Sequence, residues 1–264
     1  MLFTFLIISS ASADWFDFLL DHPFTENNDT NFVVGFNLEF PPFEYTDDNG
    51  EVTGFDIDLA QEVCDRNNWT LVKQQVIDWD TKEVELKYGA IDCIWSGLSI
   101  NGREDNYAWS KPYFNNSQVF VVKESSNISS IEDLKGKSID VGMGTSALDT
   151  ISKNKTLNEN FANVNAVKEY DTAFMDLESG TCDAVLGDCV VMQYKISTKF
   201  NNTKYKILEP PLSFEEYGIG FAQDKTELRD QVQKTLDEMY EDGTIDKIAK
   251  KYKDYGVPEG IIYP

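Results

Sequence analysis

The sequence predicts an α/β fold with two lobes, in which parallel or mixed sheets are flanked by helices. Short apolar segments typical of buried strands alternate with segments of helical spacing, and this alternation favours sheets covered by helices. The chain has 264 residues, of which 41% are hydrophobic, which is enough for one large domain or two smaller ones. A second series of strands and helices begins at Ser138 and predicts the second lobe.

The predicted elements follow one another without a repeat or a low-complexity tract. The first series has strands at 32–36, 70–76, 91–95 and 118–122, with helices at 57–67 and 82–88. The second series has strands at 138–142, 163–167 and 184–186, a helix after Ser146 and a helix at 173–179. A strand at 218–221 then returns, and helices at 227–241 and 244–252 follow it.

Residues 40–60 combine the end of a strand, two phenylalanines, a turn and the start of a helix. Pro41 and Pro42 stop the first strand, which leaves Phe40 and Phe43 at the carboxyl end of the sheet. Open α/β sheets bind ligands at that edge. A turn follows, and Gly54 leads into a helix with an apolar face. We therefore expect a ligand site near the two phenylalanines.

This segment resembles the signature of the extracellular solute-binding proteins of family 3, the amino-acid-binding proteins of ABC importers. The likeness continues in register over about residues 31–256. Its further segments are Trp79-Asp80, Gly89-Ala90-Ile91-Asp92, Ser96-Gly97-Leu98-Ser99, Arg103, Lys111-Pro112-Tyr113, Asp133-Leu134-Lys135-Gly136-Lys137, Gly144-Thr145-Ser146, Gly180-Thr181-Cys182-Asp183-Ala184-Val185, Asp188, Tyr217-Gly218-Ile219-Gly220 and Asp242-Gly243-Thr244.

The resemblance implies the type II fold of the periplasmic binding proteins, with two lobes and a hinge that the chain crosses twice. The crossings would lie near residues 114–117 and 216–219. Lobe 1 would then hold residues 31–114 and 219–264, and lobe 2 residues 115–218. Ligand binding would close the two lobes on one cleft.

A free amino acid needs a cation for its carboxylate, an anion for its ammonium group and hydrogen-bonding groups in place of lost water. By resemblance, Arg103 grips the carboxylate with its planar guanidinium, aided by Gly97 and Ser99. Thr145 and Ser146 open a helix whose free amides favour an anion, so they would close on the same carboxylate.

Asp188 matches the ammonium-binding acid of the family, although on its own it could simply cap the next helix. Phe40, Phe43 and Trp79 would stack on the ligand, the alternative being ordinary core packing. Asn37 stands where relatives for basic amino acids can carry an acid, so a neutral or polar amino acid is expected.

One motif departs from the pattern of the family. Residues 99–103 form a segment one residue shorter than is common there. We expect Gly102 to absorb the tighter turn with a positive φ, and Asn101 is a candidate to replace a missing threonine. Arg103 is retained as the carboxylate ligand because the expected pattern resumes at Trp109.

The predicted function is capture of a free L-amino acid by lobe closure, without chemistry or a cofactor, by a monomer that can deliver it to an ABC permease. One alternative is an enzyme of the same fold, similar to a cyclohexadienyl or arogenate dehydratase. It would need a positioned acid or base, and Glu39, Glu44 and Glu216 belong to no such motif. Another is the ligand-binding module of a receptor, which the lack of an apolar stretch of about 18 residues disfavours.

Charge and the N-terminal segment bear on partners and localisation. With 46 acidic against 23 basic residues, the net charge of −23 disfavours nucleic acid and anionic lipid as partners. Residues 1–13 are predicted to be a signal peptide, because an apolar run precedes Ala11-Ser12-Ala13, although no basic residue stands before it. A buried first helix is the alternative. The protein would be secreted, extracellular or periplasmic, and without a lipidated cysteine, since the first cysteine is Cys64.

Cysteines and glycosylation motifs remain open. Cys64 and Cys93 could approach each other in a parallel sheet, but free buried thiols are favoured, and Cys182 and Cys189 flank one strand too far apart to join. With His22 as the single histidine, no zinc site is expected. Six Asn-x-Ser/Thr sequons indicate either surface sugars or a chance result of the asparagine-rich composition: Asn28, Asn68, Asn115, Asn127, Asn154 and Asn201.

Overall fold

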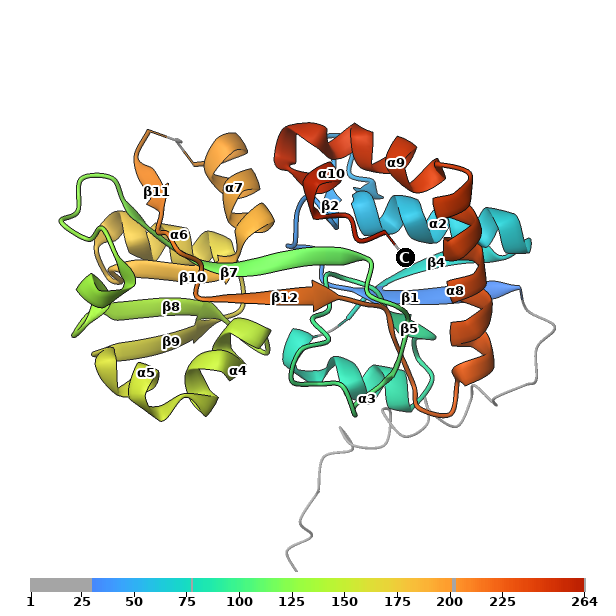
Figure 1. Cartoon of the computed structure of the whole chain (residues 1–264), viewed down its shortest axis with the longest axis horizontal. Coiled ribbons are helices and arrows are strands. Elements are labelled where there is room, and N and C mark those ends of the chain that lie inside the picture. The colour runs from blue at the N-terminus through green and yellow to red at the C-terminus, as the bar shows by residue number, and fades with distance from the viewer. Residues whose placement is uncertain (1–29, 77, 201–202, 264) are drawn as a thin grey trace, which may run out of the picture. The chain divides into compact units, whose positions relative to one another are not determined.

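Two sheets organise the computed structural model, which describes residues 30–76, 78–200 and 203–263 (Figure 1). The predicted signal peptide, residues 1–13, lies outside the described residues, as do His22 and the sequon asparagines Asn28 and Asn201. Residues from Asn31 onward form one compact unit. The α/β class predicted from the alternation of strands and helices is confirmed.

The first sheet has the strand order β4-β1-β5-β13-β6. Its strands are β1 (Asn31–Phe36), β4 (Thr70–Gln75), β5 (Cys93–Ile94), β13 (Gly220–Phe221) and β6 (Ala108–Trp109). β1 is parallel to β4 and β5, while β13 is antiparallel to β5 and β6. The carboxyl ends of β1, β4 and β5 therefore meet at one edge. A small hairpin of β2 (Tyr45–Thr46) and β3 (Val52–Thr53) lies between β1 and the first helix.

A helix with an apolar face packs against this sheet. In α2 (Phe55–Asn67), Phe55, Leu59 and Val63 recur four residues apart and are buried. α2 contacts β4 and the C-terminal helices α8 (Thr226–Glu241) and α9 (Thr244–Ala249). The other helices here are η1 (Trp79–Thr81), α3 (Lys82–Lys87), η3 (Lys250–Tyr255) and α10 (Val257–Gly260).

The second sheet has the order β11-β7-β10-β8-β9, with β12 also paired to β7. Its strands are β7 (Phe114–Lys123), β8 (Ser138–Gly142), β9 (Asn163–Val167), β10 (Ala184–Asp188), β11 (Tyr205–Ile207) and β12 (Ser213–Tyr217). β8, β9 and β10 are mutually parallel. The helices that accompany them are η2 (Ile131–Leu134), α4 (Ser146–Lys153), α5 (Lys155–Asn160), α6 (Tyr170–Ser179) and α7 (Cys189–Thr198).

β7 and β12 form an antiparallel ribbon that runs between the two sheets (Figure 1). Its pairing extends from Phe114 opposite Tyr217 to Gln118 opposite Ser213. The two chain crossings of the predicted hinge are thus hydrogen-bonded to each other. The sequence did not predict β12 as a strand, nor α7 as a helix.

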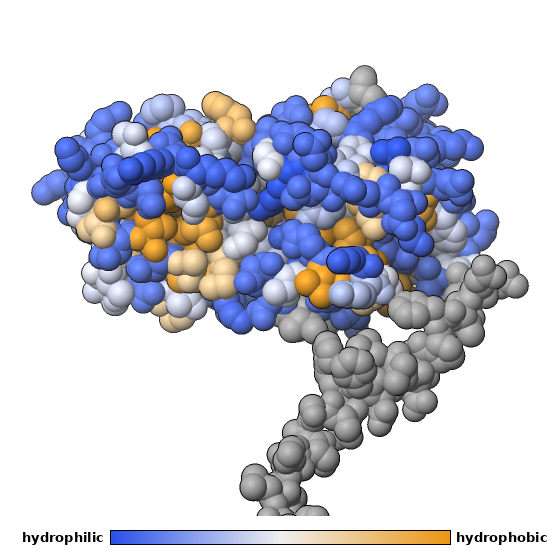
Figure 2. Space-filling view, turned by 90° about the horizontal axis from the view of Figure 1, so that it is seen from below, coloured by the Kyte–Doolittle hydropathy of each residue, from blue (hydrophilic) through white to orange (hydrophobic). Residues whose placement is uncertain are grey.

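Other expectations can be compared directly with the described residues. The four cysteines are free, as favoured, and Cys64 and Cys93 are buried without a bridge. The expected strand at 91–95 is only two residues long. No helix among the described residues has the length and apolar character that a membrane span requires. From below, the surface is mostly hydrophilic, with apolar side chains in separate patches (Figure 2).

Candidate functional site

A cavity lies where the carboxyl ends of parallel strands from both sheets face each other. Its lining comes from the segments after β1, β4, β5, β8 and β9 and from the last residue of β10. All of the predicted ligand residues except Phe43 line it: Asn37, Phe40, Trp79, Gly97, Ser99, Arg103, Thr145, Ser146 and Asp188. The fold thus brings together side chains that are up to about 150 residues apart, at the edge where open α/β sheets bind ligands.

Phe43 lies elsewhere than predicted. Its side chain is fully buried, and its ring centroid lies 5.0 Å from that of Phe114 and 5.5 Å from that of Tyr217. The cause is a tight turn in which the Phe43 amide donates to the Phe40 carbonyl, so that only Phe40 reaches the cavity. Phe43 therefore packs in the core between the first sheet and the ribbon.

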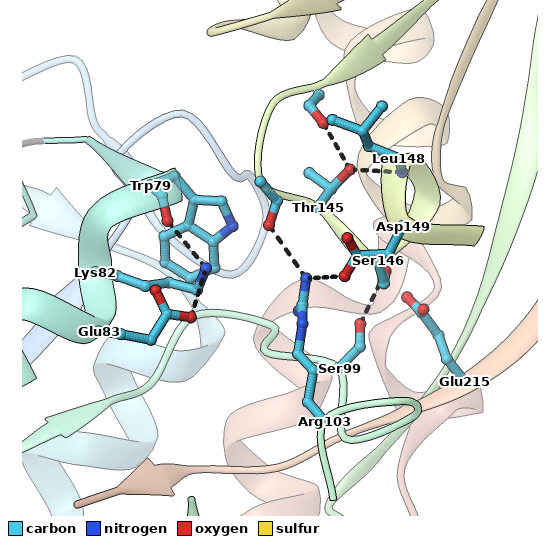
Figure 3. A network of polar contacts seen from close by, with 12 residues as sticks. Trp79, Lys82, Glu83, Ser99, Arg103, Thr145, Ser146, Leu148, Asp149 and Glu215 are labelled. Carbon is cyan, nitrogen blue, oxygen red and sulfur yellow. Dashed lines mark hydrogen bonds and ion pairs between the residues drawn. The ribbon is translucent and has the colours of Figure 1, made fainter. Parts of the chain in front are cut away.

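Arg103 connects the two sides of the cavity. Its side chain is almost buried, and Nη2 donates to the Gly144 carbonyl over 3.2 Å and to Asp149 Oδ2 over 3.1 Å (Figure 3). Nearby, Ser99 Oγ donates to Ser146 Oγ over 3.2 Å. In the described part of the chain Arg103 uses only Nη2 in this way, so its other guanidinium nitrogens can still donate to a carboxylate.

The short segment before Arg103 adopts the predicted turn. Gly102 has a φ of 76°, which glycine adopts without a steric penalty. Asn101 does not line the cavity; its Oδ1 accepts a hydrogen bond from the Glu216 amide over 2.8 Å. Asn101 therefore fastens this turn to β12 and does not replace a threonine at the cavity.

The start of α4 faces the same end of the cavity. Thr145 is the N-cap residue, and its Oγ1 donates to the Gly142 carbonyl and accepts from the Leu148 amide (Figure 3). The Thr145 hydroxyl is thus committed to the cap. The free backbone amides of the first helical turn remain the groups that favour an anion here.

Phe40 and Trp79 form an aromatic wall of the cavity, and the buried Lys82 contacts Trp79. Lys82 Nζ donates to the Trp79 carbonyl over 2.9 Å and lies 4.7 Å from the centroid of the Trp79 ring (Figure 3). It also pairs with Glu83 over 3.3 Å. Burial lowers the pKa of Lys82, and Glu83 offsets part of that change. The burial of Lys82 could not be predicted from the sequence, because the residue stands in a short helix of mostly charged residues.

Asp188 stands at the end of β10 and just before α7, but its side chain does not cap that helix. Its Oδ1 accepts hydrogen bonds from Asn116, Gln118 and Tyr217, at 2.7, 2.9 and 2.6 Å. The alternative of a capping side chain is therefore wrong. Burial, followed by the charge of Glu215, raises the pKa of Asp188 to about 7.

Several lining residues were missed from sequence: Glu39, Ser96, Met143, Lys168, Glu169 and Tyr170. Lys168 and Glu169 follow β9 directly, so the end of the predicted strand at 163–167 was the signal that could have found them. Behind the wall, Asp56 Oδ2 accepts from the Gly97 amide over 2.9 Å and so holds Gly97 in place.

A second cavity of about 100 Å³ adjoins the first and shares six lining residues with it: Asn37, Glu39, Trp79, Met143, Lys168 and Glu169. Asp78, Asp80, Glu39 and Glu169 supply acidic groups there. The single base in its lining, Lys168, is paired with Asp78 over 2.6 Å. Among the described residues no group of three or more His, Cys, Asp or Glu side chains is placed to hold a metal ion.

Comparisons with known proteins find relatives that match most of the chain. A sequence model of the family described as bacterial extracellular solute-binding proteins, family 3, matches residues 32–255. The histidine-binding periplasmic protein of Escherichia coli (strain K12) is 33% identical over 243 residues, which cover 87% of this chain and 90% of that protein. The lysine/arginine/ornithine-binding periplasmic protein of the same strain is 32% identical over 233 residues, 85% of this chain and 88% of that protein.

Solved structures show the same fold. A substrate-binding protein of an ABC uptake transporter from Streptococcus pneumoniae with bound histidine has a TM-score of 0.80 and 29% identity, covering 92% of this chain and 96% of that one. An ancestral arginine-binding protein bound to arginine has a TM-score of 0.78 and 33% identity, covering 85% and 99%. The fold is the two-lobed type II fold of the periplasmic binding proteins. These relatives are binding proteins rather than enzymes. The chain belongs to family 3 of the bacterial extracellular solute-binding proteins.

Proposed function

We propose that the protein binds a free L-amino acid between two lobes, formed by residues 31–114 with 219–264 and by residues 115–218. The observation that carries the proposal is that Arg103 and Asp188, from opposite sheets, line one cavity. They are charged groups of the two signs that the carboxylate and the ammonium group of an amino acid require. Relatives with bound histidine, arginine and glutamine support the same class of ligand.

Each lining group has a role in this proposal. Arg103 binds the α-carboxylate through its free guanidinium nitrogens, and Ser99 and Gly97 add hydrogen bonds from the same lobe. The first amides of α4, at Thr145 and Ser146, bind the carboxylate from the other lobe. Asp188 binds the α-ammonium group. The ligand thus bridges both lobes and stabilises the closed state.

The ligand side chain extends toward the second cavity, past the wall of Phe40 and Trp79. Asn37 lines both cavities and favours a neutral or polar ligand side chain, as we expected from the sequence. The acidic groups around it, including Glu39 and Glu169, accept hydrogen bonds and repel a further carboxylate. We therefore propose a polar side chain that carries N–H groups, such as that of glutamine or histidine, and exclude aspartate and glutamate.

The wider role is that of an exported monomer that delivers its amino acid to an ABC permease, as the family and the relatives named as transporter components support. Residues 1–13 are the proposed signal peptide. N-terminal sequencing of the exported protein should begin at Asp14. A mature N-terminus that retains residues 2–8 would contradict cleavage there.

A thermal-shift screen of the purified protein against the twenty amino acids, cystine, ornithine and small dipeptides tests the binding function. A ligand at 100 times its Kd should stabilise the folded protein by about 2.7 kcal/mol. The ligand should be recovered unchanged after binding. Stabilisation by none of these compounds would contradict the proposal, and turnover of a hit would favour the enzyme alternative.

A further inference from the structure

Two amide side chains of β7 connect the carboxyl groups of Asp188 and Glu215. Asn116 Nδ2 lies 2.7 Å from Asp188 Oδ1 and 2.7 Å from Glu215 Oε1. Gln118 Nε2 repeats this bridge at 2.9 Å and 2.7 Å, with a longer contact of 3.3 Å to Ser146 Oγ. Since an amide NH₂ group has two hydrogens, each amide can donate one hydrogen bond to Asp188 and one to Glu215. The carboxylate of Glu215 is directed toward Ser146 at the start of α4 (Figure 3).

Neither carboxyl group has a basic partner. Asp188 is 3% exposed and Glu215 6% exposed. None of the ion pairs between described residues includes either of them. Two buried carboxylates that lie close together without a cation disfavour full ionisation, and such pairs retain a proton.

We propose that Glu215 is a positioning residue of the ammonium subsite, where it holds a proton on Asp188 until the ammonium group of the ligand displaces that proton. The inference rests on the proposed role of Asp188. The ammonium group arrives as a cation and stays one, Asp188 ends as a carboxylate, and its proton leaves to solvent. Glu215 acts through Asp188 and the two amides, because it does not itself line the cavity.

The surroundings of Asp188 support this assignment. Burial and then the charge of Glu215 are the leading causes that raise its pKa to about 7. Tyr217 on β12 and Tyr170 on α6 are the other titratable groups that bond to Asp188, at 2.6 and 3.4 Å. Burial raises the pKa of both tyrosines well above 10, so they remain neutral donors.

The remaining charged groups of the cavity are Glu39, Arg103, Lys168 and Glu169, none of which is hydrogen-bonded to Asp188 or Glu215 in the described chain. The Asp188 oxygen Oδ2 accepts only the long bond from Tyr170 there, so it is the oxygen that can receive a ligand N–H. Loss of the Asp188 proton is therefore the ionisation that this subsite couples to ligand binding.

The ligand affinity should therefore depend on pH. The ligand binds Asp188 as a carboxylate, so its affinity should fall as the pH decreases through about 7. One proton bound at pH 5.5 to a group of pKa about 7 weakens affinity roughly 30-fold relative to pH 8. The ligand for this titration should be a hit whose side chain does not itself titrate between pH 5.5 and 8.

The test compares Glu215→Gln with Glu216→Gln, a matched change one residue along the same strand, where the side chain is exposed. Calorimetry at pH 5.5 and pH 8 measures the affinity of each. Glu215→Gln removes the neighbouring charge, so affinity should fall about tenfold at pH 8 and the 30-fold pH effect should shrink to a few-fold. Glu216→Gln should retain the wild-type pH profile.

Proton release provides a test on the wild-type protein that does not depend on the folding of a variant. Calorimetry at pH 6.5 in buffers of different ionisation enthalpy should show proton release on binding, decreasing toward pH 8.5. Binding without proton release, or a Glu215→Gln profile equal to that of wild type, would overturn the role of Glu215 and leave amino-acid binding intact. Failure of wild type to bind any amino acid would instead overturn the proposed function.

Discussion

Among the described residues, each lobe buries a pair of carboxyl groups, and the two pairs serve different purposes. Glu44 and Asp56 lie behind the cavity wall of the first lobe, at 0% and 1% exposure. Asp188 and Glu215 lie in the second, and Asp188 lines the cavity. In both pairs, burial is the leading cause that raises the pKa of the aspartate to about 7. Desolvation therefore affects the two aspartates alike. The binding pair differs from the structural pair because one of its carboxyl groups, that of Asp188, reaches the cavity.

The first pair holds the wall in shape. Asp56 Oδ2 accepts the Gly97 amide over 2.9 Å and the Tyr113 hydroxyl over 2.7 Å. Gly97 has a φ of 50°, and a Cβ there would lie 2.4 Å from the Phe40 ring. Neither oxygen of Glu44 has a hydrogen-bond partner among the described residues, and burial with the Asp56 charge raises its pKa well above 4.5. Glu44 therefore stays protonated beside Asp56.

Removing the charge of the binding pair should have the largest effect. Asp188→Asn is expected to weaken ligand binding by about 3 kcal/mol, because the ammonium group then lacks its counter-ion. The free energy of unfolding should not decrease, since one buried acidic group has been removed. Calorimetry and urea unfolding measure the two quantities. Wild-type affinity in this variant would remove Asp188 from the site.

Removing the aspartate of the structural pair should instead reduce stability more than ligand affinity. Asp56→Ala leaves the Gly97 amide and the Tyr113 hydroxyl without an acceptor, which should cost about 2 kcal/mol of stability. Affinity should fall less than in Asp188→Asn, because Asp56 acts only through Gly97. A loss of affinity as large as that of Asp188→Asn, with unchanged stability, would mean that Asp56 belongs to the binding site.

The smallest expected change concerns Glu44. Because its pKa in the folded protein is raised, wild type should lose stability as the pH rises above about 4.5, where the unfolded chain ionises and the folded one does not. Glu44→Gln abolishes that loss and should gain about 1 kcal/mol of stability at pH 8, with no gain at pH 4. Unfolding curves at the two pH values measure it. An equal effect at both would show that Glu44 is not buried as an acid.

Hydrophobic periodicity was enough to predict the strands that are buried on both faces. The segments at β1, β8 and β10 are apolar enough to be found without a partner. β12 was not, because Ser213, Glu215 and Glu216 give it a polar appearance. Glu215 is buried only because amides nearly 100 residues away on β7 receive it. That contact depends on tertiary structure and leaves no local pattern.

The candidate site was predicted mainly because motifs of this sequence match those of a family in order and spacing. The chemistry of the individual residues contributed only in part. Arg103 and Asp188 could each have been an ordinary surface residue or helix cap if read alone. Phe43 shows the limit of the approach, because the same motif places Phe40 in the cavity and Phe43 in the core. Which ring faces the cavity is decided by the turn after Phe40, whose hydrogen bond is not visible in residue types.

Calorimetric titration of the hits from the amino-acid screen into wild type, Arg103→Ala and Arg66→Ala tests the central claim most directly. Arg66 is an arginine with ion pairs to Glu62 and Asp242, outside the cavity, and serves as the matched control. Wild type and Arg66→Ala should bind the same amino acid equally, and Arg103→Ala should lose at least about 2 kcal/mol of affinity. Undiminished binding by Arg103→Ala would contradict the account of the site.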